Sequence, residues 1–212
     1  MTRGERGTWR GALIAFEGLD QSGKQTQAEL LREALAADGR EVRFLSFPEY
    51  DTAIGQEIRK GLDGARDYAA DTMQLLYIAN RYERKSDILA WLDAGLVIVC
   101  DRYLASSVAY GEAFGLDARW LLETQRFLPK PTLTILLDIA PETAVGRKST
   151  DRDRYERDLA LQHRVRDSYT RLAASSPDWV AMDGERPKVV VAADVLSAVT
   201  SALARLSARA PH

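Results

Sequence analysis

The chain has 212 residues, of which 46% are hydrophobic and 28% are charged, and its formal net charge is −2. These values are typical of a soluble globular protein and exclude a strongly basic nucleic-acid-binding protein, because no overall positive field is available to hold a polyanion. No apolar run approaches the roughly 18 residues of a membrane span, so we expect neither a nucleic acid nor a membrane as partner.

Residues 1–11 are polar and rich in glycine and arginine, and we expect them to form a flexible N-terminal leader. From residue 12 onward, short apolar runs alternate with longer stretches of helical period, which is the pattern of strand and helix units in a parallel sheet. Five strands are predicted, at 12–16, 42–47, 96–100, 133–139 and 179–182.

The helical stretches between the strands complete the predicted fold. One helix face runs through residues 30–35, a second helix begins at Met73 and continues through Leu92, and a last helix covers 191–206. Gly39 and Gly95 follow helical segments as expected C-caps. We predict a single three-layer, doubly wound α/β domain at 12–212, with a five-stranded parallel sheet of the phosphate-loop NTPase type.

The third predicted strand ends at Cys100, which is the only cysteine in the chain. One thiol cannot form an internal disulfide, and a cysteine that ends an apolar run is usually a small buried hydrophobe. We therefore expect the protein to work in the reducing cytoplasm.

The segment 16–27 reads FEGLDQSGKQTQ and joins the first predicted strand to the first predicted helix. In that context glycine permits a sharp exit from the strand, the following backbone N–H groups form an anion nest, and Lys24 reaches the outer phosphates. A Gly-rich turn with a solvated lysine is the alternative, but the flanking strand and helix favour a phosphate loop. The predicted ATP-binding residues of this loop are Gly18, Leu19, Asp20, Gln21, Ser22, Gly23, Lys24, Gln25 and Thr26.

Gln25 stands where the phosphate-loop pattern has a serine or threonine whose hydroxyl binds Mg²⁺. The substitution leaves the backbone donors and Lys24 untouched, and a glutamine oxygen can coordinate Mg²⁺ directly or through water. Asp101 directly follows a strand, at the sheet edge where α/β proteins bind ligands, although an aspartate there can also form a turn or cap a helix. We predict that Gln25 and Asp101 hold Mg²⁺ beside ATP.

Several segments together resemble thymidylate kinase, the family that transfers the γ-phosphoryl group of ATP to dTMP. They are FEGLDQSGKQTQ, FPEYDTAIG, LLYIANRYE, DRYLASSVAY, LPKP and RYERD, in family order from residue 16 to about residue 185. The resemblance implies an ATP-dependent dTMP phosphotransferase that uses Mg²⁺ and works as a homodimer formed through packed helices.

The resemblance also assigns residues to the dTMP site. It implies that Asp20 faces the deoxyribose 3′-hydroxyl and that Arg102 binds the phosphate, where a salt bridge to a carboxylate is the alternative for Arg102. Tyr77 and Arg81 share a helix face, and the resemblance has Tyr77 stacking on thymine and Arg81 bonding its edge, whereas without it Tyr77 would be interpreted as core. Further residues implied for this pocket are Phe47, Pro48, Tyr50, Ser107 and Tyr110, the last against C2′ of the sugar.

Residues 146–156 read GRKSTDRDRYE, a charged segment that by resemblance is a lid over ATP. Phosphoryl transfer develops charge on the equatorial oxygens, so cations arriving on closure are the expected catalytic device. Position 21 is glutamine and supplies no loop arginine, so Arg152 or Arg154 is the predicted transition-state cation. Arg147 is predicted to pack on adenine, and by resemblance the residues that orient the lid and acceptor side are Asp153, Tyr155 and Glu156. The turn DGERP resembles the segment that holds adenine, although its glycine and proline could simply form a turn.

Two other interpretations stay open at this point. One is a kinase for another nucleotide or deoxynucleoside, against which Arg81, Ser107 and Tyr110 argue for thymine and a deoxy sugar. The other is a nucleotide-binding module without turnover, which Gln25 favours.

Overall fold

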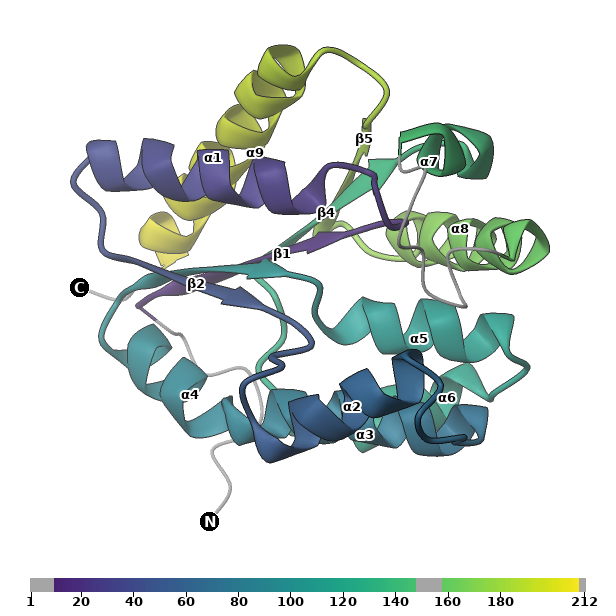
Figure 1. Ribbon diagram of the computed structural model, residues 1–212. Coiled ribbons are helices and arrows are strands. Elements are labelled where there is room, and N and C mark those ends of the chain that lie inside the picture. The colour runs from purple at the N-terminus through teal and green to yellow at the C-terminus, as the bar shows by residue number, and fades with distance from the viewer. Residues whose placement is uncertain (1–9, 148–157, 210–212) are drawn as a thin grey trace.

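A computed structural model describes residues 10–147 and 158–209 (Figure 1). Its centre is a parallel sheet in the order β2-β3-β1-β4-β5. The strands are β1 (Ala12–Glu17), β2 (Val42–Ser46), β3 (Val97–Asp101), β4 (Leu133–Asp138) and β5 (Trp179–Asp183), each within one residue of its predicted ends. The doubly wound α/β fold expected from the sequence is confirmed.

The helices cover both faces of this sheet (Figure 1). Helices α1 and α9 pack on one face, and α4, α5 and α8 pack on the other, so nearly all strand residues of β1, β3 and β4 are buried. This double coverage explains the continuous apolar runs of the sequence. The helices are α1 (Lys24–Ala37), α2 (Ala53–Leu62), α3 (Ala70–Glu83), α4 (Lys85–Asp93), α5 (Leu104–Ala113), α6 (Ala118–Thr124), α7 (Pro141–Arg147), α8 (Leu159–Ala174) and α9 (Lys188–Arg209).

The central strand β1 is the point at which the chain changes direction across the sheet. It pairs with β3 on one side and with β4 on the other, which places Phe16 opposite Asp101 and Glu17 opposite Leu136. Loops at the carboxyl ends of these three strands therefore meet, as expected at a topological switch point. The segment 18–23 lies at that point, between β1 and α1.

The continuous helix predicted from Met73 through Leu92 is wrong, because the structure has two helices that meet at Arg84. Arg84 adopts φ −95° and ψ 0°, and its N–H donates to the carbonyl of Arg81 rather than continuing the helical ladder. The change of direction lets α3 pack on α5 through Ile78, while α4 packs on the sheet through Leu92. A periodic pattern cannot reveal the break, since both helices are apolar at helical spacing.

Two glycine caps and the buried cysteine agree with the sequence predictions. Gly39 and Gly95 adopt φ values of 79° and 88°, in the left-handed region that ends helices, and the N–H of Arg40 donates to the carbonyl of Leu35. Cys100 is fully buried as a free thiol, and burial raises its pKa.

Helix α9 has the length and composition of a membrane span, with a mean hydropathy of 1.7 within 188–208. The sequence prediction missed this property because the apolar residues are interrupted by polar ones. One face of α9 packs in the core, where Val191, Val195, Val199 and Leu203 are buried against β1, β4 and α1. Only 28% of the apolar window is buried, so core packing accounts for that face and not for the apolar composition of the whole helix.

Candidate active site

The phosphate loop has a backbone that only particular residues allow. Gly18 adopts φ 137°, and a Cβ at this position would lie 2.5 Å from the carbonyl oxygen of Leu137 on β4. Gly23 and Gln21 also have positive φ, at 94° and 62°. The glycine in front therefore lets the loop lie against β4, and the left-handed residues curl its amide groups inward.

Lys24 projects into this loop. Its side chain is nearly buried, at 5% exposure, and Nζ donates to the carbonyl of Leu19 at 2.6 Å and contacts Ser22 Oγ at 3.5 Å. Burial and the neighbouring positive charge of Arg102 lower the pKa of Lys24 to about 8, although nearby carboxylates such as that of Asp20 act in the opposite direction. The loop thus surrounds the Lys24 ammonium, which donates to one carbonyl of the loop and lies near one of its hydroxyls.

The two predicted magnesium ligands differ in their surroundings. Gln25 is exposed, and its Nε2 donates to Glu29 Oε1 at 3.0 Å along the surface of α1, with Thr26 exposed beside it. Asp101 is half-buried, but its Oδ1 is buried and finds no hydrogen-bond partner among the described residues. Burial raises the pKa of Asp101, although the charges of Lys24 and Arg102 act in the opposite direction. Asp101 is therefore the better placed of the two to face a cation.

Arg102, Asp20 and Tyr110, which the resemblance assigns to the phosphate and sugar of dTMP, form one cluster. Arg102 Nη2 donates to Asp20 Oδ1 at 2.6 Å, and Tyr110 OH donates to Asp20 Oδ2 at 2.9 Å. Burial alone would raise the pKa of Asp20, but the positive charges of Arg102 and Lys24 outweigh it and hold this pKa well below its usual range. The ion pair that the sequence left open for Arg102 is thus present, and it fixes Asp20 as an anion.

The backbone of Arg102 aims its side chain into this cluster. Its φ of 62° is unusual for a residue with a Cβ, and its N–H donates to the carbonyl of Phe16 at 2.9 Å. The guanidinium then reaches across the end of β1, where Nη1 donates to the Gly18 carbonyl at 3.2 Å, to Ser106 Oγ at 3.1 Å and to Tyr169 OH at 3.3 Å. Strained backbone at this position is maintained by these tertiary contacts.

Arg81 and Ser107, predicted on the base-binding side, also come together. Arg81 is 3% exposed, and its Nη1 donates to Ser107 Oγ at 2.7 Å and contacts Gln125 Oε1 at 3.4 Å. Its Nε has no hydrogen-bond partner in the described part of the chain, and burial lowers its pKa. A buried guanidinium with an unused donor suits recognition of an acceptor group.

The loop after β2 contributes the remaining residues predicted for the acceptor pocket. Phe47 is buried beside Tyr103, Pro48 follows a cis peptide bond, and Tyr50 lies under the guanidinium of Arg59 at 4.4 Å. Tyr77 is half-buried on α3. The predicted pocket residues thus come from two elements: the loop after β2 holds Phe47, Pro48 and Tyr50, and α3 holds Tyr77 and Arg81.

The sequence interpretation missed five residues that support this site. Asn80 stands in the segment LLYIANRYE but received no role, and a polar residue on a helix face that packs inward is the signal that could have found it. Glu17 and Ser106 also stand inside quoted motifs but received no role, whereas Gln125 and Tyr169 reach the site from parts of the chain that no motif marks.

On the other side of the loop, Arg147 links three elements. From the end of α7, its Nη1 donates to the carbonyl of Gln21 at 3.1 Å and its Nη2 to that of Gly184 at 2.9 Å. Arg147 therefore connects the turn DGERP to the phosphate loop. The lid residues Arg152, Asp153, Arg154, Tyr155 and Glu156 lie outside the described residues.

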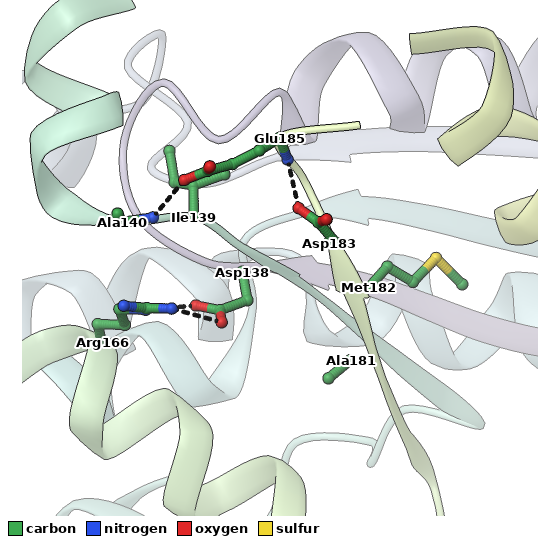
Figure 2. Close-up of a pocket in the computed structure, with 8 residues that line it drawn as sticks. All are labelled: Asp138, Ile139, Ala140, Arg166, Ala181, Met182, Asp183 and Glu185. Atoms are coloured by element: carbon green, nitrogen blue, oxygen red, sulfur yellow. Dashed lines mark hydrogen bonds and ion pairs between the residues drawn. The ribbon is translucent and has the colours of Figure 1, made fainter. Parts of the chain in front are cut away.

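A pocket of about 400 Å³ opens beside this turn (Figure 2). In it, Arg166 Nε and Nη2 donate to the two oxygens of Asp138 at 2.7 and 2.8 Å, and Glu185 accepts from the N–H of Ala140 at 2.9 Å. Its lining comes from the carboxyl ends of β4 and β5 and from α8, and comprises Asp138, Ile139, Ala140, Arg166, Ala181, Met182, Asp183 and Glu185. These polar contacts tie α7 and α8 to the sheet edge.

Comparison with known proteins agrees with this geometry. The sequence profile of the family described as thymidylate kinase matches residues 16–195. A thymidylate kinase of Plasmodium falciparum is 35% identical over 90% of each chain, and a probable thymidylate kinase of Pyrococcus abyssi is 40% identical over 77% of this chain and 83% of that protein.

Among solved structures, the thymidylate kinase of Candida albicans superposes with a TM-score of 0.81 at 29% identity, covering 91% of this chain and 92% of that one. That structure was described in terms of broad substrate specificity. The match spans both sides of the phosphate loop and the acceptor cluster, and the chain belongs to the thymidylate kinase family.

Proposed function

We propose that this chain transfers the γ-phosphoryl group of ATP to dTMP and releases dTDP and ADP. Family membership supports the reaction. The observation that supports assigning it to particular residues is the Asp20–Arg102–Tyr110 cluster beside Lys24. A cation for the donor phosphates and a second cation for the acceptor phosphate stand on either side of the end of β1. Phosphoryl transfer needs little more from the protein than such positioning and charge.

At the ATP end, the inward-facing amides of residues 18–23 bind the phosphates and Lys24 exchanges its carbonyl partner for phosphate oxygens. Arg147 lies against adenine, beside the turn at Gly184. Arg152 or Arg154 reaches the transferred group when the segment 146–156 closes as a lid, with Asp153, Tyr155 and Glu156 orienting it. These cations balance the charge that develops on the equatorial oxygens.

At the dTMP end, Arg102 binds the phosphate, and Asp20 accepts a hydrogen bond from the 3′-hydroxyl. Tyr110, held by Asp20, lies against C2′ and leaves no room for a ribose hydroxyl. Arg81 and Ser107 recognise the edge of thymine, and Tyr77 stacks on its face. The loop residues Phe47, Pro48 and Tyr50 close the remaining side.

Magnesium fits the same site through Asp101. Its buried oxygen without a hydrogen-bond partner is suited to a hard cation or to a water bound to one. No group of three or more His, Cys, Asp or Glu side chains gathers within 10–147 and 158–209, so of the protein's side chains Asp101 would be the main one to hold the ion. Bound Mg²⁺ supplies neutralisation of the phosphate charge, and Gln25 contributes at most a contact through water, since its amide faces Glu29.

We also propose that residues 12–212 act as one nucleoside monophosphate kinase domain, in a cytoplasmic homodimer. Exposed apolar side chains on α3, on α6 and just after α6 support a helix-packed interface. They include Leu75, Leu122 and Phe127, with exposed fractions of 44%, 52% and 50%. Apolar side chains that gather on a soluble protein commonly mark such contacts.

A coupled ADP-release assay with dTMP, dUMP, dCMP, dGMP and thymidine as acceptors tests the reaction. We expect dTMP to give the highest kcat/KM. A higher kcat/KM with another acceptor would replace the proposed substrate, and ATP binding without turnover on any acceptor would favour a binding module.

Replacing the buried cation tests the donor site. We expect Lys24→Ala to lower kcat by about 10²–10³-fold, because one preorganised charge at the transferred group is removed. Lys60→Ala is the matched control, since Lys60 is an exposed lysine paired with Glu57 on α2. Equal kcat values for the Lys24→Ala variant and the unmodified protein would contradict the proposed donor site.

A further inference from the structure

Glu17, the last residue of β1, has a fully buried carboxylate (0% exposed). Its Oε1 accepts hydrogen bonds from the backbone N–H groups of Tyr103, Ala105 and Ser106, at 2.9, 3.2 and 3.3 Å. N–H groups at the start of a helix have no partner within the helix. The carboxylate of Glu17 on β1 therefore caps the start of α5. That start directly follows the strained residue Arg102.

The other oxygen of Glu17 faces two hydroxyl groups that also contact Arg102. Oε2 accepts from Ser106 Oγ at 2.6 Å and from Tyr169 OH at 3.0 Å. Both hydroxyl oxygens in turn accept from Arg102 Nη1, at 3.1 and 3.3 Å. Two short paths thus connect the Glu17 carboxylate to the guanidinium.

The direction of these hydrogen bonds follows from what each group can donate. A guanidinium only donates and a hydroxyl has one hydrogen, so each hydroxyl that accepts from Arg102 must send its hydrogen elsewhere. The two hydroxyls are 2.9 Å apart, but they cannot both satisfy each other. A carboxylate is acceptor-only and takes both hydrogens, which leaves the lone pairs of Ser106 and Tyr169 toward Arg102. Burial raises the pKa of Tyr169, so its hydrogen stays in place.

We propose that Glu17 is a positioning residue for the phosphate of dTMP, holding Arg102 in one orientation through the hydroxyls of Ser106 and Tyr169. It acts at a distance, since its own atoms face α5 and α8 rather than the acceptor. The inference rests on the proposed function of Arg102 as the phosphate ligand. Glu17 would then contribute to the preference for a nucleotide over a nucleoside.

The variant Glu17→Gln reverses one set of these hydrogen bonds while keeping the side-chain shape. The single amide oxygen serves the three backbone N–H groups, and the NH₂ faces the two hydroxyls, whose hydrogens then turn toward Arg102. We expect the Kd for dTMP to rise about tenfold or more, since a buried donor loses its acceptor. The Kd values for thymidine and for ATP should stay within about twofold.

The ratio of the thymidine Kd to the dTMP Kd separates this role from general damage, because a distorted pocket weakens both ligands. Glu112→Gln is the matched control: Glu112 also joins α5 to α8, through Ser168 and Arg171, but has no contact with Arg102 among its recorded hydrogen bonds. We expect its ratio to be unchanged. If Glu17→Gln does not fold, the double variant Ser106→Ala/Tyr169→Phe removes both paths and leaves the cap of α5, and the same fall in the ratio is expected.

A double-mutant cycle with Arg102→Ala completes the test. If Glu17 acts through Arg102, adding Glu17→Gln to Arg102→Ala weakens dTMP binding no further. Additive losses would overturn the inference, as would an unchanged ratio in Glu17→Gln or in the Ser106/Tyr169 variant while Arg102→Ala lowers it. An unchanged ratio in Arg102→Ala itself would overturn the proposed role of Arg102, and this inference with it.

Discussion

Lys24 is a cation that the fold holds almost out of water, at 5% exposure, with another cation nearby. Both conditions disfavour its charged form, and the carboxylates of Asp20 and Asp101 only partly compensate. The lysine is therefore closer to losing its proton than a surface lysine. Phosphate oxygens would restore the missing negative charge, so binding of ATP and protonation of Lys24 favour each other.

This coupling gives ATP binding a specific pH dependence. The pKa of Lys24 is about 8, so the ammonium is present below that pH and is lost above it. We expect the affinity for ATP to fall by roughly tenfold between about pH 7 and about pH 9, because the fraction of charged lysine falls by about that factor per unit above the pKa. Isothermal titration calorimetry across that range measures it.

The control for this pH dependence is Lys24→Arg, which keeps its charge throughout the range. Its ATP affinity should change little with pH, whatever its absolute value. The same pH dependence in both proteins would show that another group titrates.

The roles of single residues were predictable from the sequence where the local backbone requires a particular residue type or where the residue has a known place in a motif. Gly18 and Lys24 belong to a pattern that serves one purpose, and Arg102 directly follows a strand that ends at the ligand edge. Tyr169 lies in no quoted motif, and Glu17 lies in one without a recognisable role, since their contact joins positions 152 residues apart. The chemistry of a buried carboxylate depends on which side chains the fold brings to it, and spacing does not encode that.

At the scale of elements, Asn80 connects α3 to the loop after β2. It is fully buried, and its Oδ1 accepts from the N–H of Glu49 at 2.7 Å while Nδ2 donates to the Glu49 carbonyl at 3.1 Å and to Thr52 Oγ1 at 3.0 Å. Arg84, in the break between α3 and α4, also binds Glu49. Its Nε and Nη2 donate to the two carboxylate oxygens of Glu49, at 2.6 and 2.8 Å. The loop that carries Phe47 and Tyr50 is thus fixed to the helix that carries Arg81.

The variant Asn80→Ala should loosen this loop. We expect the free energy of unfolding to fall by about 1–3 kcal/mol, because buried backbone groups of the loop lose their partners. The KM for dTMP should rise while the KM for ATP stays unchanged, since the phosphate loop is untouched. Denaturant unfolding and initial-rate kinetics measure the two effects.

Thr72→Ala, at an exposed position of the same helix, is the comparison for Asn80→Ala. It should leave both quantities near their starting values. A parallel rise of both KM values in Asn80→Ala would mean that the residue supports the whole fold and not the acceptor loop in particular.

The elements themselves were predictable to the extent that periodicity defines them. All five strands were located within one residue, because a strand buried on both faces gives a short continuous apolar run. The α3–α4 break was not, since it depends on Glu49 meeting Arg84 across 35 residues of sequence. Helices α2, α5 and α6 were not predicted; α2 and α6 carry few buried apolar residues, and α5 was interpreted only as part of a motif after the third strand.

At the scale of the whole molecule, α9 closes one face of the sheet. Leu203 is 5% exposed in the core cluster shared with β1 and α1, whereas Leu196 on the same helix is 37% exposed. These two leucines distinguish a helix that packs on its own sheet from one that is only apolar.

We expect Leu203→Ala to lower the free energy of unfolding by about 2–5 kcal/mol, because it leaves a cavity beside the sheet. Leu196→Ala should change it by no more than about 0.5 kcal/mol. Urea unfolding without detergent gives both values. Equal effects would contradict the packed position of α9.

The proposed homodimer can be tested in the same way. We expect Leu122→Glu, at an exposed position of α6, to shift the protein from dimer to monomer in sedimentation velocity, because a carboxylate at an apolar interface is costly to desolvate. Val189→Glu is the control, since Val189 is 71% exposed on α9, away from α3 and α6. A dimer unaffected by Leu122→Glu would place the interface elsewhere.

Strand β1 also determines how the protein can be attached to a support. Gly11 hydrogen-bonds the carbonyl of Leu92 where β1 begins, and the phosphate loop starts where β1 ends. A strand of six residues spans about 20 Å, so the first and last residues of β1 lie at opposite ends of the parallel strands. An affinity tag or fluorophore placed ahead of residue 11 would therefore leave nucleotide entry unobstructed, which favours this end for immobilised assays.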